Sequence, residues 1–204
     1  MKNYGLEGCI DTHVHSSPDV RERKMTDFEL LKEAVKQKVR GIVIKSHHIP
    51  TVARAADMNE VCRELYGNST AFQMYGGITL NQFVGGINPW AVETALEMGG
   101  KIVWMPTVHS VSHAQREGGE AVICIKDGKV TQDLKIVIQL VIEHDGVLAT
   151  SHLTPNEIFV VVDQAKEQGL NKIIISHTES NLVGLTLQEQ KRLVLDYDVM
   201  LERC

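Results

Sequence analysis

Short apolar segments alternate with amphipathic helical patterns along almost the whole chain, and this order constrains the fold more than any other feature. Strands that are regularly separated by helices form a parallel sheet with the helices packed outside it. The pattern therefore predicts an α/β protein. The predicted strands lie within residues 8–15, 42–45, 71–80, 101–105, 147–150, 172–176 and 198–202.

Helix-start signals mark where several of the helices begin. Thr26 is followed by Glu29, and Thr186 by Glu189, so each pair has the spacing of a capping box. In this motif the threonine side chain accepts a hydrogen bond from the glutamate N–H, and the glutamate side chain accepts one from the threonine N–H. Both pairs therefore predict a helix directly after the threonine.

One segment departs from the alternation. Residues 122–125 and 129–130 flank Asp127 and Gly128, and an Asp-Gly pair favours a two-residue hairpin turn. We therefore expect an inserted β-hairpin near 122–130. The other strands number seven, which indicates a TIM-like (β/α) barrel that lacks the eighth strand of a closed one. Either the barrel is a shorter variant or the eighth unit is absent from this chain, and residues 1–204 are interpreted as one barrel domain.

The composition argues against several classes of partner. The formal net charge is −5 and no basic tract is present, so we expect no nucleic-acid partner. No apolar run approaches the roughly 18 residues of a membrane-spanning helix, and residues 1–5 lead into a strand without the apolar core of a signal peptide. The four cysteines are far apart and form no C-x-x-C pair, which predicts reduced thiols. We expect a cytoplasmic protein with no membrane partner and with a small-molecule substrate.

Histidines gather where the predicted strands end. Among the nine histidines, His13 and His15 are two residues apart on one strand, and side chains with that spacing point to the same side. Active sites of β/α barrels are built where the strands end and the following loops begin. Further histidines follow strands in the same way: His47, His48, His109, His152 and His177. His113 and His144 lie elsewhere.

This gathering predicts a metal centre. Imidazole is a good ligand for zinc and for neighbouring transition metals. We expect one or two divalent ions, zinc first, with manganese, iron or nickel as alternatives because ligand type alone does not fix the metal. The predicted metal ligands are His13, His15, His152 and His177.

The candidate catalytic residues are Asp11, Lys45, His47 and His109. Asp11 shares the strand face of the first histidine pair, where it could hydrogen-bond a ligand histidine and fix its tautomer. Lys45 ends an apolar strand; it is either a metal ligand after carboxylation, a cation that orients substrate, or a lysine that extends to solvent. His47 and His109 bind substrate, complete a second metal site or only line the rim. Glu202, near the last strand, is a spare acid–base candidate or a salt-bridge residue.

Several segments resemble the amidohydrolase superfamily. Residues 11–15 (DTHVH) look like its strand-one motif, and Ser151-His152 and Ser176-His177 look like its strand-five and strand-six histidines. Longer strings resemble an uncharacterised amidohydrolase-like branch: DTHVHSSPD, IKSHHIPT, GGITLNQFVGGINP, VWMPT and ATSHLTP. The resemblance implies a distorted TIM barrel with one or two divalent metals. It also implies a hydrolase in which a metal-activated water attacks an amide, ester, lactone or similar bond of a small molecule.

Two features of the superfamily pattern have no match. The strand-four ligand, a lysine or glutamate, has no counterpart in residues 104–107 (WMPT), and Lys45 on strand two would substitute for it. The strand-eight aspartate, which serves the superfamily as ligand and general base, would lie beyond Cys204. The base would then be Asp11, a rim histidine or a carboxylate from a partner subunit.

Two alternatives to the hydrolase stay open. A PHP-type phosphoesterase also begins with H-x-H and uses a seven-stranded barrel, but residues 45–47 and 77–79 lack the acidic residues expected of it. A degenerate barrel that binds a metal or ligand without catalysis is the other alternative. An open sheet edge favours self-association, so we expect a homo-oligomer.

Overall fold

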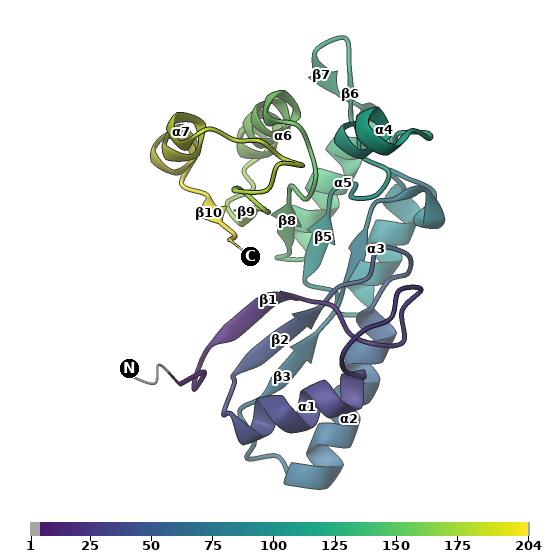
Figure 1. Cartoon of the computed structure of the whole chain (residues 1–204), viewed down its shortest axis with the longest axis vertical. Coiled ribbons are helices and arrows are strands. Elements are labelled where there is room, and N and C mark those ends of the chain that lie inside the picture. Colours follow the sequence, from purple (N-terminus) through teal and green to yellow (C-terminus); the bar gives the residue numbers. More distant parts are fainter. Residues whose placement is uncertain (1–4, 204) are drawn as a thin grey trace.

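The computed structural model describes residues 5–203 and shows parallel strands alternating with helices (Figure 1), which confirms the predicted α/β class. The first half contains β1 (Ile10–Val14), α1 (Asp27–Lys36), β2 (Gly41–Ile44), α2 (Val52–Tyr66), β3 (Gln73–Tyr75), β4 (Gly77–Thr79), the 3-10 helix η1 (Gln82–Val84) and α3 (Pro89–Glu97). The second half contains β5 (Ile102–Trp104), α4 (Val111–Glu117), β6 (Ile125–Lys126), β7 (Lys129–Val130), α5 (Gln132–Glu143), β8 (Val147–Ala149), α6 (Pro155–Glu167), β9 (Ile173–Ile175), α7 (Leu187–Tyr197) and β10 (Met200–Leu201).

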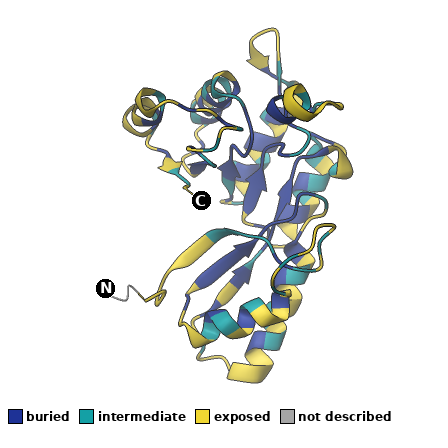
Figure 2. Cartoon of the chain, viewed as in Figure 1, coloured by how far each residue is buried: buried dark blue, intermediate teal, exposed yellow. Residues whose placement is uncertain are grey.

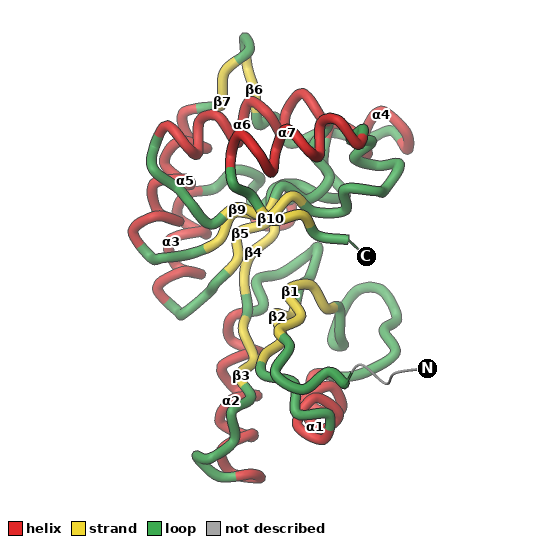
Figure 3. The backbone as a smooth tube through the Cα atoms, turned by 90° about the vertical axis from the view of Figure 1, so that its left-hand side faces the viewer, coloured by secondary structure: helices red, strands yellow, loops and turns green. Residues whose placement is uncertain are grey.

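The parallel strands form two sheets that share no hydrogen-bonded ladder within residues 5–203. The first sheet has the order β1–β2–β3, and the second has the order β10–β9–β8–β5–β4. Helices α1 and α2 lie beside the first sheet, whereas α3, α5, α6 and α7 cover the second (Figures 1 and 3). The strand predicted within 71–80 contributes to both sheets because it is interrupted at Gly76, between β3 and β4.

Gly77 lets β4 approach β5 closely. A Cβ atom at this position would overlap the carbonyl oxygen of Ile102 and would lie 2.6 Å from Cζ3 of Trp104. Both contacts are far inside van der Waals distance, so a larger residue would displace the strand or the ring. The missing side chain thereby leaves room for Trp104, which is fully buried.

The predicted hairpin and capping boxes are present. β6 and β7 pair antiparallel. Asp127 and Gly128 join them with φ angles of 52° and 73°, as the type I′ turn requires. Thr26 and Thr186 each make both hydrogen bonds of a capping box, at the starts of α1 and α7. These signals act over a few residues, which explains why they could be predicted without the fold.

The main apolar core lies between the second sheet and its helices (Figure 2). A smaller core joins the two sheets across the space between them, because Val43 of β2 packs with Trp104 of β5. Its other buried members are Ile102, Ala149 and Ile174. Within the described residues, no helix combines the length and the apolar character needed to cross a bilayer.

β1 and β10 are edge strands, and no ladder joins them within residues 5–203. A cavity of about 560 Å³ is lined by Ile10 and Thr12 of β1, by Met200 and Leu201 of β10, and by residues of the strands between. Within residues 5–203, and with β3 and β4 counted as one interrupted strand, the parallel strands number the predicted seven. Over the same residues, hydrogen bonds do not close these strands into a barrel.

Candidate metal centre

Imidazole rings from both sheets meet at the carboxyl ends of the parallel strands. The ring centroids of His13 and His15 lie 5.2 Å apart, and their Nε2 atoms lie 3.3 Å apart. The ring centroids of His15 and His47 lie 4.7 Å apart, and those of His13 and His177 lie 4.9 Å apart. The ring centroids of His177 and His152 lie 5.1 Å apart. These residues form the histidine cluster: His13, His15, His47, His152 and His177. All four predicted metal ligands belong to it.

A β-bulge shapes the strand that carries the first histidines. Asp11 lies opposite Ile42 and Val14 opposite Ile44, so three steps on β1 match two on β2. The extra residue interrupts the regular alternation of side chains between the two faces of the strand. The expectation that Asp11 shares a face with His13 and His15 depended on that alternation. The Asp11 carboxylate is exposed and accepts a hydrogen bond from the backbone N–H of His13 at 3.0 Å. The structure therefore does not place Asp11 on a ligand ring.

The backbone is in the left-handed conformation at His177 and directly before His152, two of the predicted ligands. His177, just after β9, has a φ of 53°, and Ser151, just before His152, has a φ of 51°. This conformation is uncommon outside glycine, although histidine is enriched in it. It persists where the surrounding structure fixes it, and such positions cluster at functional sites. The chain turns sharply at both strand ends, where the His152 and His177 rings meet.

Glu202 brings a carboxylate into the histidine cluster. Its Oε1 atom lies 2.8 Å from Nδ1 of His13 and 3.7 Å from Nδ1 of His177. One ligand atom from each of these residues lies within 4.8 Å of the others. Burial favours the neutral carboxyl, but the hydrogen bond and charge of His13 outweigh it and lower the pKa of Glu202. An ionised carboxylate beside imidazoles is a donor set that suits a divalent ion.

Lys45 is fully buried next to the cluster. It directly follows β2, and its Nζ atom lies 5.3 Å from the centroid of the Trp104 ring. The side chain does not extend to solvent, so that interpretation of Lys45 is wrong. Its charge acts on His47, His152 and His177.

Burial keeps the rings of His15, His47, His152 and His177 neutral. It is the largest cause that lowers the pKa of His15 to about 3, of His47 to about 2 and of His152 to about 2. Burial and then Lys45 lower the pKa of His177 to about 4. At pH 7 these rings are neutral, and neutral imidazole has the lone pair that a metal requires.

A polar network holds His47. Its Nδ1 atom lies 2.8 Å from the Thr107 hydroxyl, which also accepts a hydrogen bond from the Asn81 amide at 2.7 Å. The same amide donates to the His47 carbonyl at 2.9 Å. The Asn81 oxygen accepts from the backbone N–H groups of Thr107 and His109. The loops that contain Asn81 and Thr107 are thus both hydrogen-bonded to His47.

His109 is placed beside the cluster rather than in it. Its ring contacts Phe83, with centroids 4.8 Å apart, and Phe83 contacts His48 at 4.6 Å. Burial, followed by the charges of His48 and His113, lowers the pKa of His109. Of the expected catalytic residues, the structure therefore brings Lys45 and His47 to the cluster.

His113 was not among the sequence-predicted site residues. It lies on α4, where its ring stacks on His152 with centroids 5.0 Å apart and an angle of 15° between the planes. Its Nδ1 atom lies 3.7 Å from Oε1 of Glu117, one helical turn later. The local signals for this short helix are Ser110, whose side chain caps its start, and Gly118, which ends it.

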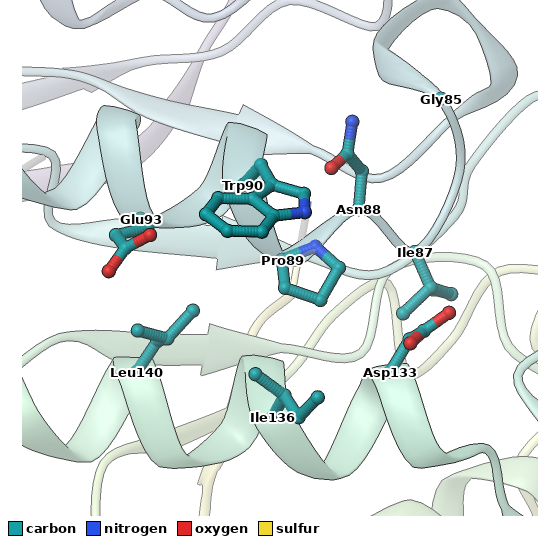
Figure 4. A pocket seen from close by; sticks show the side chains of 9 residues that line it. All are labelled: Gly85, Ile87, Asn88, Pro89, Trp90, Glu93, Asp133, Ile136 and Leu140. Atoms are coloured by element: carbon teal, nitrogen blue, oxygen red, sulfur yellow. The ribbon is translucent and has the colours of Figure 1, made fainter.

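A separate cavity of about 450 Å³ lies between α3 and α5 (Figure 4). Trp90 and Pro89 face Ile136 and Leu140 across it. Its lining contains no histidine, cysteine or lysine. It therefore offers no imidazole ligand, and the histidine cluster is the candidate functional site.

One solved structure supports the fold. An amidohydrolase from Pseudomonas aeruginosa is similar with a TM-score of 0.62 and 13% sequence identity, over 97% of this chain and 62% of that protein. A Coccidioides immitis protein assigned as a deoxyribose-phosphate aldolase gives a TM-score of 0.44 and 12% identity, over 83% of this chain and 59% of its own. The chain thus spans less than two thirds of either protein. At such identities the first likeness supports the fold alone.

Sequence comparison places the chain in a family. No curated protein matches it. The sequence model of DUF6282, a family of unknown function, matches residues 8–202. This span includes the whole histidine cluster, Lys45 and Glu202. The chain therefore belongs to the DUF6282 family.

Proposed function

We propose that this chain is a metal-dependent hydrolase of the amidohydrolase type, built on a TIM-like barrel. The observation that carries the proposal is the convergence of imidazoles from two sheets on one ionised carboxylate. The position of the cluster at the carboxyl ends of parallel strands agrees with it, because β/α barrels build their active sites there. The reaction would cleave an amide, ester, lactone or similar bond of a small molecule.

The residues present fit one or two divalent ions, zinc first. His13, His177 and Glu202 already have their ligand atoms within 4.8 Å of one another. His152 adds an Nδ1 atom that is buried and has no hydrogen-bond partner among residues 5–203. His15 completes the set. A metal bound there would supply the acidity that brings a water pKa toward roughly 7 and would polarise the scissile bond.

The protein side chains would position and exchange protons around that bond. Glu202 orients the His13 ring through a 2.8 Å contact and is the carboxylate that would accept the proton of the attacking water. Thr107 holds the His47 ring at 2.8 Å, where His47 would contact substrate. Lys45 supplies a buried positive charge that would stabilise a developing negative oxygen.

The metal content of purified protein tests the proposal. Wild-type protein and the His144→Ala control, altered at the end of α5 away from the cluster, should hold stoichiometric metal by elemental analysis. The double variant His13→Ala/His15→Ala should hold none. Stoichiometric metal retained in the double variant would contradict the assigned ligands.

Turnover then separates the reaction classes. Metal-loaded protein should hydrolyse members of a panel of lactones, esters and amides in preference to a chromogenic phosphate. Turnover confined to the phosphate would favour a PHP-type phosphoesterase. Bound metal without turnover on any substrate class would favour the non-catalytic barrel.

A further inference from the structure

The cavity of about 560 Å³ beside the edge strands β1 and β10 runs along the whole length of β10. Its lining includes Asp198, two residues before that strand, and Glu202, directly after it. Four residue steps of extended chain span at most about 13 Å. The cavity therefore extends from the amino ends of the parallel strands to their carboxyl ends, where the histidine cluster lies. We call it the strand cavity.

The amino end of the strand cavity is polar. The lining residues at this end are exposed, and each lies one or two positions before a strand: Lys101, Asp145, Asn171, Lys172 and Asp198. Two of them form an ion pair, because Nζ of Lys172 lies 2.5 Å from the Asp145 carboxylate. This end is therefore hydrated and can accept the free or polar end of a ligand.

The middle of the strand cavity is apolar. Its wall contains Val43, Ile102 and Ile174, which are buried members of the smaller core between the two sheets. Tyr75 and Val147 line the cavity as well and pack against the same core. Because these side chains come from strands of both sheets, a ligand in the cavity would contact the two sheets at once.

The two edge strands also present apolar side chains to the cavity. Ile10 of β1 is 48% exposed and Met200 of β10 is 70% exposed, and both belong to the lining. Removing apolar surface from water is favourable roughly in proportion to the area that is covered. A ligand with an apolar body would therefore be stabilised by covering surface on these side chains.

Glu202 joins the strand cavity to the histidine cluster. It lines the cavity, and its Oε1 atom lies 2.8 Å from Nδ1 of His13. Thr12, the neighbour of His13 in the chain, also belongs to the lining. A ligand that fills the cavity would thus reach the carboxylate to which the proposed function assigns the proton of the attacking water.

We propose that the strand cavity binds an extended apolar chain of the substrate, with the bond to be cleaved at Glu202 and the far end of the chain toward Lys101 and Lys172. Ligand sites are mostly apolar with a few placed polar groups, and this lining is apolar between two polar ends. The role in substrate choice rests on the proposed hydrolase. Binding of the chain itself can be measured without turnover.

Two probe ligands test the preference for a chain. Octanol and butanol have the same hydroxyl group and differ only in chain length. Each methylene that becomes buried strengthens binding about fourfold, so NMR titrations of wild-type protein should give a dissociation constant for octanol at least about tenfold lower than for butanol. The amide signals that shift most should include those of Ile10, Thr12 and Leu201.

Variants place the probe in the strand cavity. Ile10→Asp and Val147→Asp each put a carboxylate in the lining, and both should lose most of the preference for octanol, because a charge beside an apolar chain would lose hydration. The matched controls are Ile123→Asp, exposed like Ile10, and Val61→Asp, half-buried like Val147. Neither control residue lines the cavity, and both variants should keep the preference. Circular dichroism shows which variants are folded.

Equal binding of octanol and butanol to wild-type protein would overturn the inference, as would a preference that survives in both folded cavity variants. A second copy of the chain seated in the cavity would overturn it too. Gel filtration would then show a dimer that Ile10→Asp converts to a monomer, and octanol would not bind to the wild-type dimer.

Ester hydrolysis and elemental analysis keep the two proposals apart. Metal-loaded wild-type protein should have a higher kcat/KM for phenyl octanoate than for phenyl acetate, and Ile10→Asp should lose this difference. A preference for octanol in protein that binds no metal would support the strand cavity and contradict the hydrolase. Bound metal and ester turnover without any preference for chain length would do the reverse.

Discussion

Nδ1 of His13 lies 2.8 Å from Oε1 of Glu202, so a side chain of the first sheet contacts one that follows the last strand of the second. A carboxylate on a ligand histidine fixes the ring and its tautomer, and losing one costs about 10–100-fold in metal affinity. Glu202→Gln should therefore weaken metal binding by at least about tenfold in competition with a chelator. Glu179→Gln, which removes a surface pair with Arg203, should leave the affinity unchanged. Equal affinities for the two variants would contradict the role of Glu202.

Stability of the metal-free protein should fall in mild acid. The folded pKa values of His15, His47 and His152 lie below the ordinary 6.5, so the unfolded chain binds more protons at any pH between. Above pH 6.5 these rings are neutral in both the folded and the unfolded state, so stability is complete there. As the pH falls toward the folded pKa values, the unfolded chain takes up protons that the folded protein does not, and the free energy of unfolding decreases. Each buried ring contributes on the order of 1 kcal/mol per pH unit in that window.

Urea unfolding of chelator-treated protein at pH 7.5, 6.5 and 5.5 measures this loss. Most of the decrease should come between the two lower pH values. His152→Gln should reduce the slope by about one proton, whereas His144→Gln, outside the cluster, should keep it. A free energy of unfolding that is constant from pH 7.5 to 5.5 would show that the rings are not held neutral.

The Thr107 hydroxyl should be needed to hold His47. Thr107→Val removes the group that lies 2.8 Å from the ring and leaves the Asn81 amide without one of its acceptors. Leaving a buried polar group unpaired costs about 1–3 kcal/mol, so this variant should be less stable by that amount. It should also lower kcat more than Thr107→Ser, which keeps the hydroxyl. If valine and serine gave the same stability and kcat, the network would not position His47.

A buried ion pair anchors the segment that follows His15. Nε and Nη2 of Arg54 lie 2.7 and 2.8 Å from the two oxygens of Asp27, and Nη2 also donates to the Ser16 carbonyl at 3.1 Å. Removing one partner of a buried pair leaves an uncompensated charge, which lowers the free energy of unfolding by about 3–5 kcal/mol. Arg54→Met should lower the free energy of unfolding by that amount in urea. Arg63→Met, whose Glu60 partner is exposed, should change it by less than about 0.5 kcal/mol. Similar losses in both variants would contradict the difference in burial.

Much of the fold could be predicted because its signals are local. The capping boxes at Thr26 and Thr186 and the Asp127-Gly128 turn depend on residues within a few positions of one another. The meeting of His13 with His177 could be predicted for a different reason. Parallel strands bring their carboxyl ends to one edge whatever their exact pairing.

The features that could not be predicted depend on pairing between distant segments. The interruption at Gly76 becomes visible only when β3 pairs with β2 and β4 with β5. The bulge in β1, which separates Asp11 from the ligand rings, is likewise a property of the ladder with β2. His113 reaches His152 from a helix with too little apolar periodicity to be recognised. Glu202 was only a spare candidate because its contact with His13 spans nearly the whole chain.

Because the strands form two sheets, the histidine cluster contains residues from both of them. His13, His15 and His47 follow or belong to strands of one sheet, and His152, His177 and Glu202 follow strands of the other. An ion bound by residues of both groups would link the two sheets, which share no backbone ladder within residues 5–203. Binding of an ion at this site would then increase the rigidity of the whole molecule.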